Sequence, residues 1–154
     1  KNVIRMRTFS KAYGMAGLRV GYAIGEKDLI LNFEKIRNHF GMSRISQVGA
    51  LAALEDYDFI SEVINKVKLS RNRIADIANN NSCKFIPSFT NFVAIDCLKD
   101  SKFAKKVLEN LINNGVFVRM PYSYPQNRCI RVTVGLDKDI DLFEKYFPIA
   151  LKES

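Results

Sequence analysis

The chain has 154 residues, which is enough for one domain or for a small domain with part of another. Lys and Arg exceed Asp and Glu by 24 − 16 = 8, but the basic residues are scattered, which favours a solvated surface over a nucleic-acid-binding module. No apolar run approaches the roughly 20 residues of a membrane helix. Because residues 1–7 are charged where an apolar region would be required, we expect no signal peptide.

The N-terminal half combines short strands with longer helices. Strands are predicted over residues 3–7 and 18–24, with a glycine-bearing loop between them. A helix follows from about Asp28, and another, capped by Ser46, ends near Glu55. A long helix is predicted over 58–79, and the polar residues 79–82 end it. Its expected buried stripe is Ile60, Val63, Ile64, Val67, Ile74 and Ile77.

The remaining residues have the pattern of a small α+β unit. We predict strands over 84–86, 91–96, 116–120 and 129–134, and helices over 102–113 and 139–151. Gly115 provides the left-handed residue that ends the first of these helices. The predicted class is therefore α/β, with residues 1–81 ending a larger domain and 82–154 forming a small C-terminal domain. Since the first residue is Lys and a strand begins at once, we expect a fragment of a longer protein.

Cysteine and histidine give no sign of a metal site. Cys83, Cys97 and Cys129 are irregularly spaced without a CxxC pair, which argues against bound zinc and against a disulfide framework. Reduced cysteines in a cytoplasmic protein are the simpler interpretation. His39, the single histidine, has no triad-like neighbours, so a packed or surface role is favoured.

The stretch from residue 8 to residue 22 carries the chemistry. Hydroxyls, the lysine Lys11, flexible glycines and Arg19 lie close together in sequence. Hydroxyls, exposed backbone N–H groups and a guanidinium can hold a phosphate. A neutral lysine amine attacks carbonyl groups when desolvation or cationic neighbours lower its pKa. Phosphate and aldehyde together suggest pyridoxal 5'-phosphate (PLP), although a glycine-loop lysine is by itself more often a surface residue.

The same string resembles the PLP-lysine motif of fold-type I aminotransferases, S-K-x-x-G-x-x-G-x-R-x-G-Y, at every specified position. The resemblance implies that Lys11 forms the Schiff base with the cofactor and moves the proton at the substrate Cα. It also implies that Thr8, Ser10 and Arg19 hold the cofactor phosphate.

Later segments are similar to the histidinol-phosphate-aminotransferase-like branch of this family. They are residues 46–54, 88–92, 115–119 and 130–135. The likeness implies that Arg131, and beside it Arg119, bind the acidic group of the substrate. Either arginine could instead pair with a carboxylate such as Asp96 or Asp137. Asn91 is expected either to contact the substrate or to hold a turn.

By resemblance the parent protein is a transaminating enzyme of amino-acid biosynthesis, acting on histidinol phosphate or an aromatic amino acid and a 2-oxo acid. The resemblance also implies a homodimer. The family's N-terminal portion supplies the partner of the pyridine nitrogen, so we expect this chain to be inactive by itself. A PLP-dependent decarboxylase on the same scaffold and a noncatalytic remnant are the alternatives.

Overall fold

The computed structural model describes residues 3–154, which form two compact units. The first ends at Ile64 and the second begins at Asn65, so the division falls inside the long helix α3, Tyr57–Asn80. The last two thirds of α3, residues 65–80, belong with the C-terminal unit because they pack there, whereas the sequence places a domain boundary at residues 81–82. That boundary stays a prediction. No helix in residues 3–154 is both long enough and apolar enough to cross a membrane.

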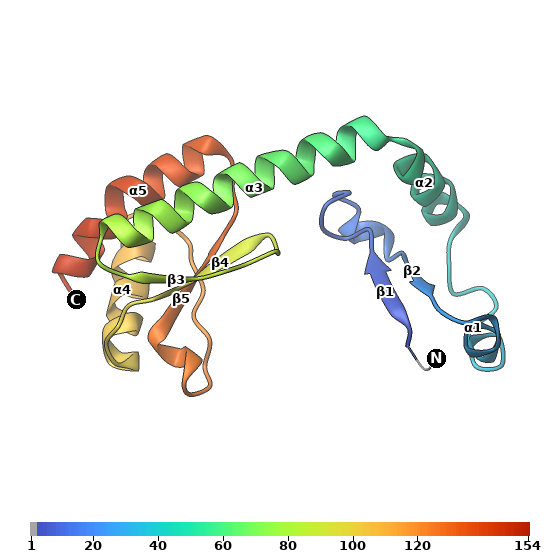
Figure 1. Ribbon diagram of the computed structural model, residues 1–154, viewed down its shortest axis with the longest axis horizontal. Coiled ribbons are helices and arrows are strands. Elements are labelled where there is room, and N and C mark those ends of the chain that lie inside the picture. The colour runs from blue at the N-terminus through green and yellow to red at the C-terminus, as the bar shows by residue number, and fades with distance from the viewer. Residues whose placement is uncertain (1–2) are drawn as a thin grey trace. The chain divides into compact units, whose positions relative to one another are not determined.

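A two-stranded antiparallel sheet and two helices make up the N-terminal unit (Figure 1). Strand β1, Arg5–Thr8, pairs with β2, Gly21–Ile24, so that Thr8 lies opposite Gly21. Between them, residues Ala16–Leu18 form the 3-10 turn η1. Helices α1, Lys27–Phe33, and α2, Arg44–Glu55, follow. The buried residues of this unit's cluster are Phe9, Val20 and Ala50.

Two sequence predictions for the N-terminal unit were wrong in detail. Strand β2 begins at Gly21 rather than at residue 18, because η1 and the left-handed Arg19 (φ 50°) precede it. The cap of α2 is Ser43, whose side-chain oxygen accepts a hydrogen bond from the Ser46 backbone N–H over 3.1 Å. Ser46 therefore lies inside the first turn, where its side chain has another partner.

The C-terminal unit contains a three-stranded antiparallel sheet in the order β3-β4-β5 (Figure 1). Its strands are β3, Lys84–Ile86, β4, Phe92–Asp96, and β5, Cys129–Thr133. Helix α4, Ser101–Asn113, lies between β4 and β5 in the chain, and α5, Asp137–Lys152, follows β5. Asp100 caps α4 by accepting the Phe103 N–H, and Gly115 (φ +79°) follows its end, as predicted.

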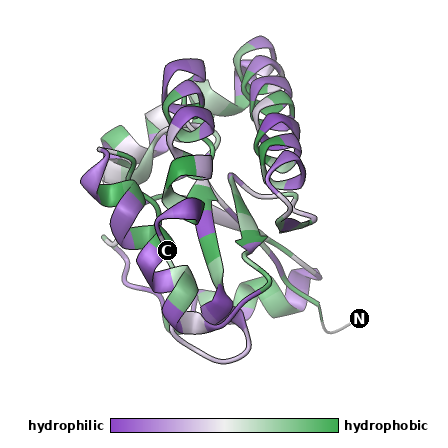
Figure 2. Ribbon diagram, turned by 90° about the vertical axis from the view of Figure 1, so that its left-hand side faces the viewer, coloured by the Kyte–Doolittle hydropathy of each residue, from purple (hydrophilic) through white to green (hydrophobic). Residues whose placement is uncertain are grey.

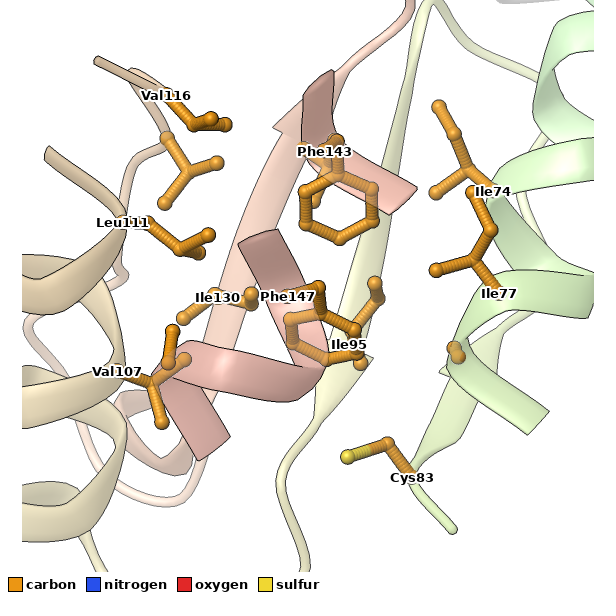
Figure 3. Close-up of a cluster of buried hydrophobic side chains, with 14 of the residues drawn as sticks. Ile74, Ile77, Cys83, Ile95, Val107, Leu111, Val116, Ile130, Phe143 and Phe147 are labelled. Carbon is orange, nitrogen blue, oxygen red and sulfur yellow. The ribbon is translucent and has the colours of Figure 1, made fainter. Parts of the chain in front are cut away.

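The core of this unit lies between its sheet and its three helices. Side chains of α4 and α3 approach the paired rings of Phe143 and Phe147 from opposite sides (Figure 3). The two rings stack with centroids 4.8 Å apart. Alternate strand residues complete the cluster: Val93, Ile95, Ile130 and Val132. Hydrophobic positions on the helices alternate with hydrophilic ones, which places the polar faces away from this core (Figure 2).

The predicted strand over 116–120 is reduced to one bridge. Arg119 exchanges both backbone hydrogen bonds with Arg131, but no strand is formed around it. Pro121 lies two residues along, where the next exchanged pair would need an N–H that proline lacks. The predicted stripe of α3 also holds only in part: Ile74 and Ile77 are buried, while Ile64 is exposed.

Candidate cofactor and substrate sites

The loop between β1 and β2 winds around the buried ring of Phe9. The Phe9 N–H donates to the Val20 carbonyl over 3.2 Å, and the Phe9 carbonyl accepts the Met15 N–H over 3.0 Å. The rings of Tyr13 and Tyr22 flank it, with centroids 4.9 and 5.6 Å away. An apolar anchor thus fixes the loop from within, and the polar residues that follow Phe9 are turned outward.

The four residues predicted to hold the cofactor all lie on this loop or its edge. The Thr8 hydroxyl donates to the Ser10 hydroxyl over 2.9 Å and accepts the Ser10 N–H over 3.1 Å. Arg19 donates to the Ala16 carbonyl over 2.7 Å, which leaves other guanidinium N–H groups available. Lys11 is exposed, and among residues 3–154 neither Lys11 nor Arg19 has a carboxylate partner. Hydroxyls, a free amine and a free guanidinium fit a ligand with an anionic group and an aldehyde.

The N-terminal segment that includes the loop carries charge of one sign in its sequence. Residues 1–25 contain five basic side chains and no Asp or Glu; the first carboxylate is that of Glu26. The basic residues are Lys1, Arg5, Arg7, Lys11 and Arg19. A segment with only positive charges attracts anions.

The predicted substrate residues lie in the C-terminal unit. Arg119 and Arg131 are directly opposite each other, joined by backbone hydrogen bonds of 3.1 and 2.6 Å. Like charges placed opposite each other across strands are unfavourable unless an anion lies between them. Both line an open groove of about 920 Å³ whose walls include Leu108, Phe117 and Tyr122. The pair could therefore bind an acidic ligand with apolar parts.

The two carboxylates that the sequence suggests as partners of Arg131 are those of Asp96 and Asp137. Asp96 is buried, accepts the Leu98 N–H over 2.9 Å and is paired with Arg128 over 2.6 Å. Within residues 3–154, neither Asp96 nor Asp137 forms an ion pair with Arg131. The remaining candidate, Asn91, is exposed and accepts the Val134 N–H on its backbone carbonyl over 2.9 Å.

Sequence reasoning missed two residues that support these sites. Ser46 is buried and donates its hydroxyl proton to the Leu18 carbonyl, next to Arg19. Its position three residues after Ser43 resembles a cap pattern, which hid this longer-range contact. Phe92 lies against the Arg131 guanidinium, whose carbon is 4.7 Å from the ring centroid. The sequence carries no local signal for this contact, because it depends on the register of β4 with β5.

Comparison with known proteins identifies the family. The family model described as aminotransferase class I and II matches residues 1–142. The chain belongs to this family. A histidinol-phosphate aminotransferase of Bacillus velezensis is 42% identical over 134 residues, and one of Aliarcobacter butzleri is 38% identical over 134 residues. These matches cover 87% of the chain and 36% of each relative.

Solved structures of family members share the fold. The histidinol-phosphate aminotransferase of Sinorhizobium meliloti, solved in complex with pyridoxal-5'-phosphate, superposes with a TM-score of 0.90 at 47% identity. It is matched over 98% of this chain and 41% of its own. An L-threonine-O-3-phosphate decarboxylase from Porphyromonas gingivalis superposes at 0.79, covering 99% of this chain and 47% of its own, with 18% identity, which shows a common fold alone. The predicted α/β class is thus correct, and the chain spans about two fifths of these proteins.

Proposed function

We propose that this chain supplies the cofactor lysine and the substrate arginines of a PLP-dependent histidinol-phosphate aminotransferase. The observation that carries the proposal is the loop at Lys11, where an exposed amine without a carboxylate partner is carried on the same loop as Ser10 and Arg19, with Thr8 at its edge. Family membership and the names of the similar enzymes support it. The activity belongs to the full-length protein, and we expect none from this chain alone.

In this proposal the N-terminal unit binds the cofactor. Ser10 and Thr8 offer hydroxyl groups to the cofactor phosphate, and Arg19 neutralises its charge. Lys11 would hold the cofactor aldehyde through Nζ and, with substrate bound, would move the proton from the substrate Cα to C4′ of the cofactor. When bound, PLP supplies an aldehyde that receives the amino group and a ring that withdraws electrons from that Cα.

The C-terminal unit recognises the substrate. Arg131 and Arg119 bind its phosphate or carboxylate, because two adjacent guanidinium groups present several N–H donors in fixed planes. Asn91, which precedes β4, is proposed to contact the substrate as well. Holding the anion in one orientation lowers the entropy lost on reaching the transition state.

The test of Lys11 begins with the 154-residue chain, PLP and borohydride, followed by peptide mass spectrometry. We expect a stoichiometric adduct on Lys11, no adduct at that peptide in Lys11→Ala, and full labelling in Lys138→Ala, which removes an exposed lysine of α5. In the full-length protein, Lys11→Ala should abolish transamination of histidinol phosphate. An absent or evenly distributed adduct would support a noncatalytic remnant.

A decarboxylase is the second candidate, because a phosphothreonine decarboxylase shares the fold. Single-turnover assays of the full-length protein separate the two reactions. Transamination forms pyridoxamine phosphate and a 2-oxo product, whereas decarboxylation releases carbon dioxide and leaves the cofactor as the aldehyde.

The proposal extends to the setting of the enzyme. We infer a cytoplasmic enzyme of amino-acid biosynthesis that acts as a homodimer. Three free buried cysteines support a reducing compartment. Light scattering of the full-length protein tests the dimer, and a monomer with full activity would contradict it.

A further inference from the structure

The guanidinium of Arg131 is held by an aromatic ring. Its carbon lies 4.7 Å from the centroid of the Phe92 ring, within the range of a cation–π contact. No carboxylate in the described part of the chain pairs with Arg131. The acidic residue of the neighbouring strand, Asp96, is occupied by Arg128.

The strand register produces this contact. Ala94 is the direct partner of Arg131 across β4 and β5, and Phe92 is the partner of Thr133. Phe92 is therefore the diagonal neighbour of Arg131 on the same face of the sheet. Ala94 contributes only a methyl group, so the long arginine side chain extends across it to the ring.

A ring and a carboxylate beside Arg131 would leave its guanidinium with different net charge. A carboxylate would neutralise Arg131 and occupy its N–H groups, whereas a ring face attracts the cation and leaves the N–H edges open. Arg131 Nε is buried without a hydrogen-bond partner in the described structure. A buried donor of this kind is unfavourable until an acceptor arrives.

We propose that Phe92 is a positioning residue that sets the plane of the Arg131 guanidinium for an incoming phosphate or carboxylate. The inference rests on the proposed role of Arg131 in substrate binding. Phe92 does not contact the ligand in this scheme. It acts by restricting the arginine to an orientation in which its unpaired donors, Nε included, are ready for an anion.

The test uses the PLP-loaded full-length enzyme, with inorganic phosphate titrated by calorimetry. Phe92→Leu removes the ring and should weaken phosphate binding about 3- to 10-fold, in line with a partly exposed cation–π contact. It should raise KM for the phosphorylated substrate by a similar factor and leave kcat nearly unchanged. Phe92→Tyr keeps a ring face and should restore both values.

The matched control is Phe103→Leu, which removes another ring under a cation, that of Lys99 at 3.8 Å. It should leave phosphate affinity unchanged. Fluorinated phenylalanines at position 92 provide a second measurement that preserves shape. Phosphate affinity should fall stepwise with each added fluorine, because fluorine weakens the negative potential of the ring face. A flat series would overturn the positioning role.

Arg131→Met separates this inference from the proposed function. If that variant keeps the phosphate affinity of the parent enzyme, Arg131 is not the anion-binding residue and the proposed substrate site fails. If Arg131→Met loses the affinity while Phe92→Leu and the fluorinated series keep it, the substrate site stands and the role of Phe92 is refuted.

Discussion

The side-chain hydroxyl of Ser46 donates a hydrogen bond to the backbone carbonyl of Leu18 over 2.6 Å, across 28 positions of sequence. Ser46 is buried in the first turn of α2, and Leu18 ends η1 within the loop that carries Lys11. A second hydrogen bond, 2.8 Å long, joins the hydroxyls of Ser43 and Ser46. The cap of α2 and the candidate cofactor loop are therefore joined by consecutive hydrogen bonds, from Ser43 to Ser46 and from Ser46 to Leu18.

Ser46→Ala should loosen this loop. The substitution leaves the Leu18 carbonyl without its partner, a loss of about 1–2 kcal/mol. Hydrogen exchange of the amides of residues 9–20 should accelerate by roughly tenfold or more, since 1.4 kcal/mol corresponds to a factor of ten. Ser61→Ala, at an exposed position of α3, should leave these rates unchanged. Equal protection in both variants would mean that the hydrogen bond does not stabilise the loop.

Gly21→Ala should disturb the pairing of β1 with β2. A Cβ atom at Gly21 would lie 2.6 Å from the Arg7 carbonyl oxygen, which is too close for any real contact. The strands must separate, and we expect a destabilisation of about 1–3 kcal/mol. At Gly17 nothing lies within 4 Å of the added atom, so Gly17→Ala is the control. Thermal unfolding of both variants measures the difference, and similar melting temperatures would contradict the expectation.

Arg128→Met should destabilise the C-terminal unit through Asp96. The Asp96 side chain is 8% exposed and that of Arg128 is 51% exposed, so the loss falls mainly on a carboxylate left without its cation. We expect about 1–3 kcal/mol in urea unfolding. Asp96→Asn should make the Arg128→Met substitution less harmful. If the losses in free energy of unfolding from the two substitutions simply add in the double variant, Arg128 and Asp96 are not coupled.

The stability of the C-terminal unit should fall in alkali because of its cysteines. The Cys97 thiol hydrogen-bonds to Cys83 and is buried, and both effects raise the pKa of Cys97 above its ordinary 9.0. Burial likewise raises the pKa of Cys129, whereas the interaction with Cys97 lowers the pKa of Cys83. The Cys97 and Cys129 thiols stay protonated in the folded state while the unfolded chain ionises, so the stabilisation from these two thiols is complete below pH 9 and is lost as the pH rises further.

Urea unfolding at about pH 8 and about pH 10 measures this dependence. The double variant Cys97→Ala/Cys129→Ala should lose less stability over that interval than the parent chain, even if it is less stable at pH 8. Lysine and tyrosine side chains also titrate over this pH interval. The measurement therefore compares how steeply the free energy of unfolding falls with pH in the parent chain and in the double variant. An unchanged slope would exclude the buried thiols as its source.

The sequence predicted the regular elements well where local periodicity decides them. Strand β3 has the predicted bounds, and α4 differs by one residue at its start. Prediction failed where distant or non-repeating contacts decide the structure. The interaction of Ser46 with Leu18 joins elements far apart in the chain, and the single bridge at Arg119 depends on Pro121 and on a strand ten residues away.

For the candidate site, the sequence proposes residues but does not reveal the contacts that support them. The motif around Lys11 gave the cofactor residues through resemblance, and those assignments stay predictions. Local pattern could not show that Phe92 lies against Arg131, because the contact needs the register of β4 with β5. Nor could it show that Arg128, rather than Arg131, takes Asp96.

The backbone of Arg19 has a consequence for protein design. Its φ of 50° is the left-handed conformation, which disfavours a residue with a Cβ by roughly 1–2 kcal/mol relative to glycine. Folding alone would select the smallest residue at this point, yet a bulky cation occupies it. A redesign aimed only at thermal tolerance would therefore choose glycine there and, if our proposal holds, would remove the anchor of the cofactor.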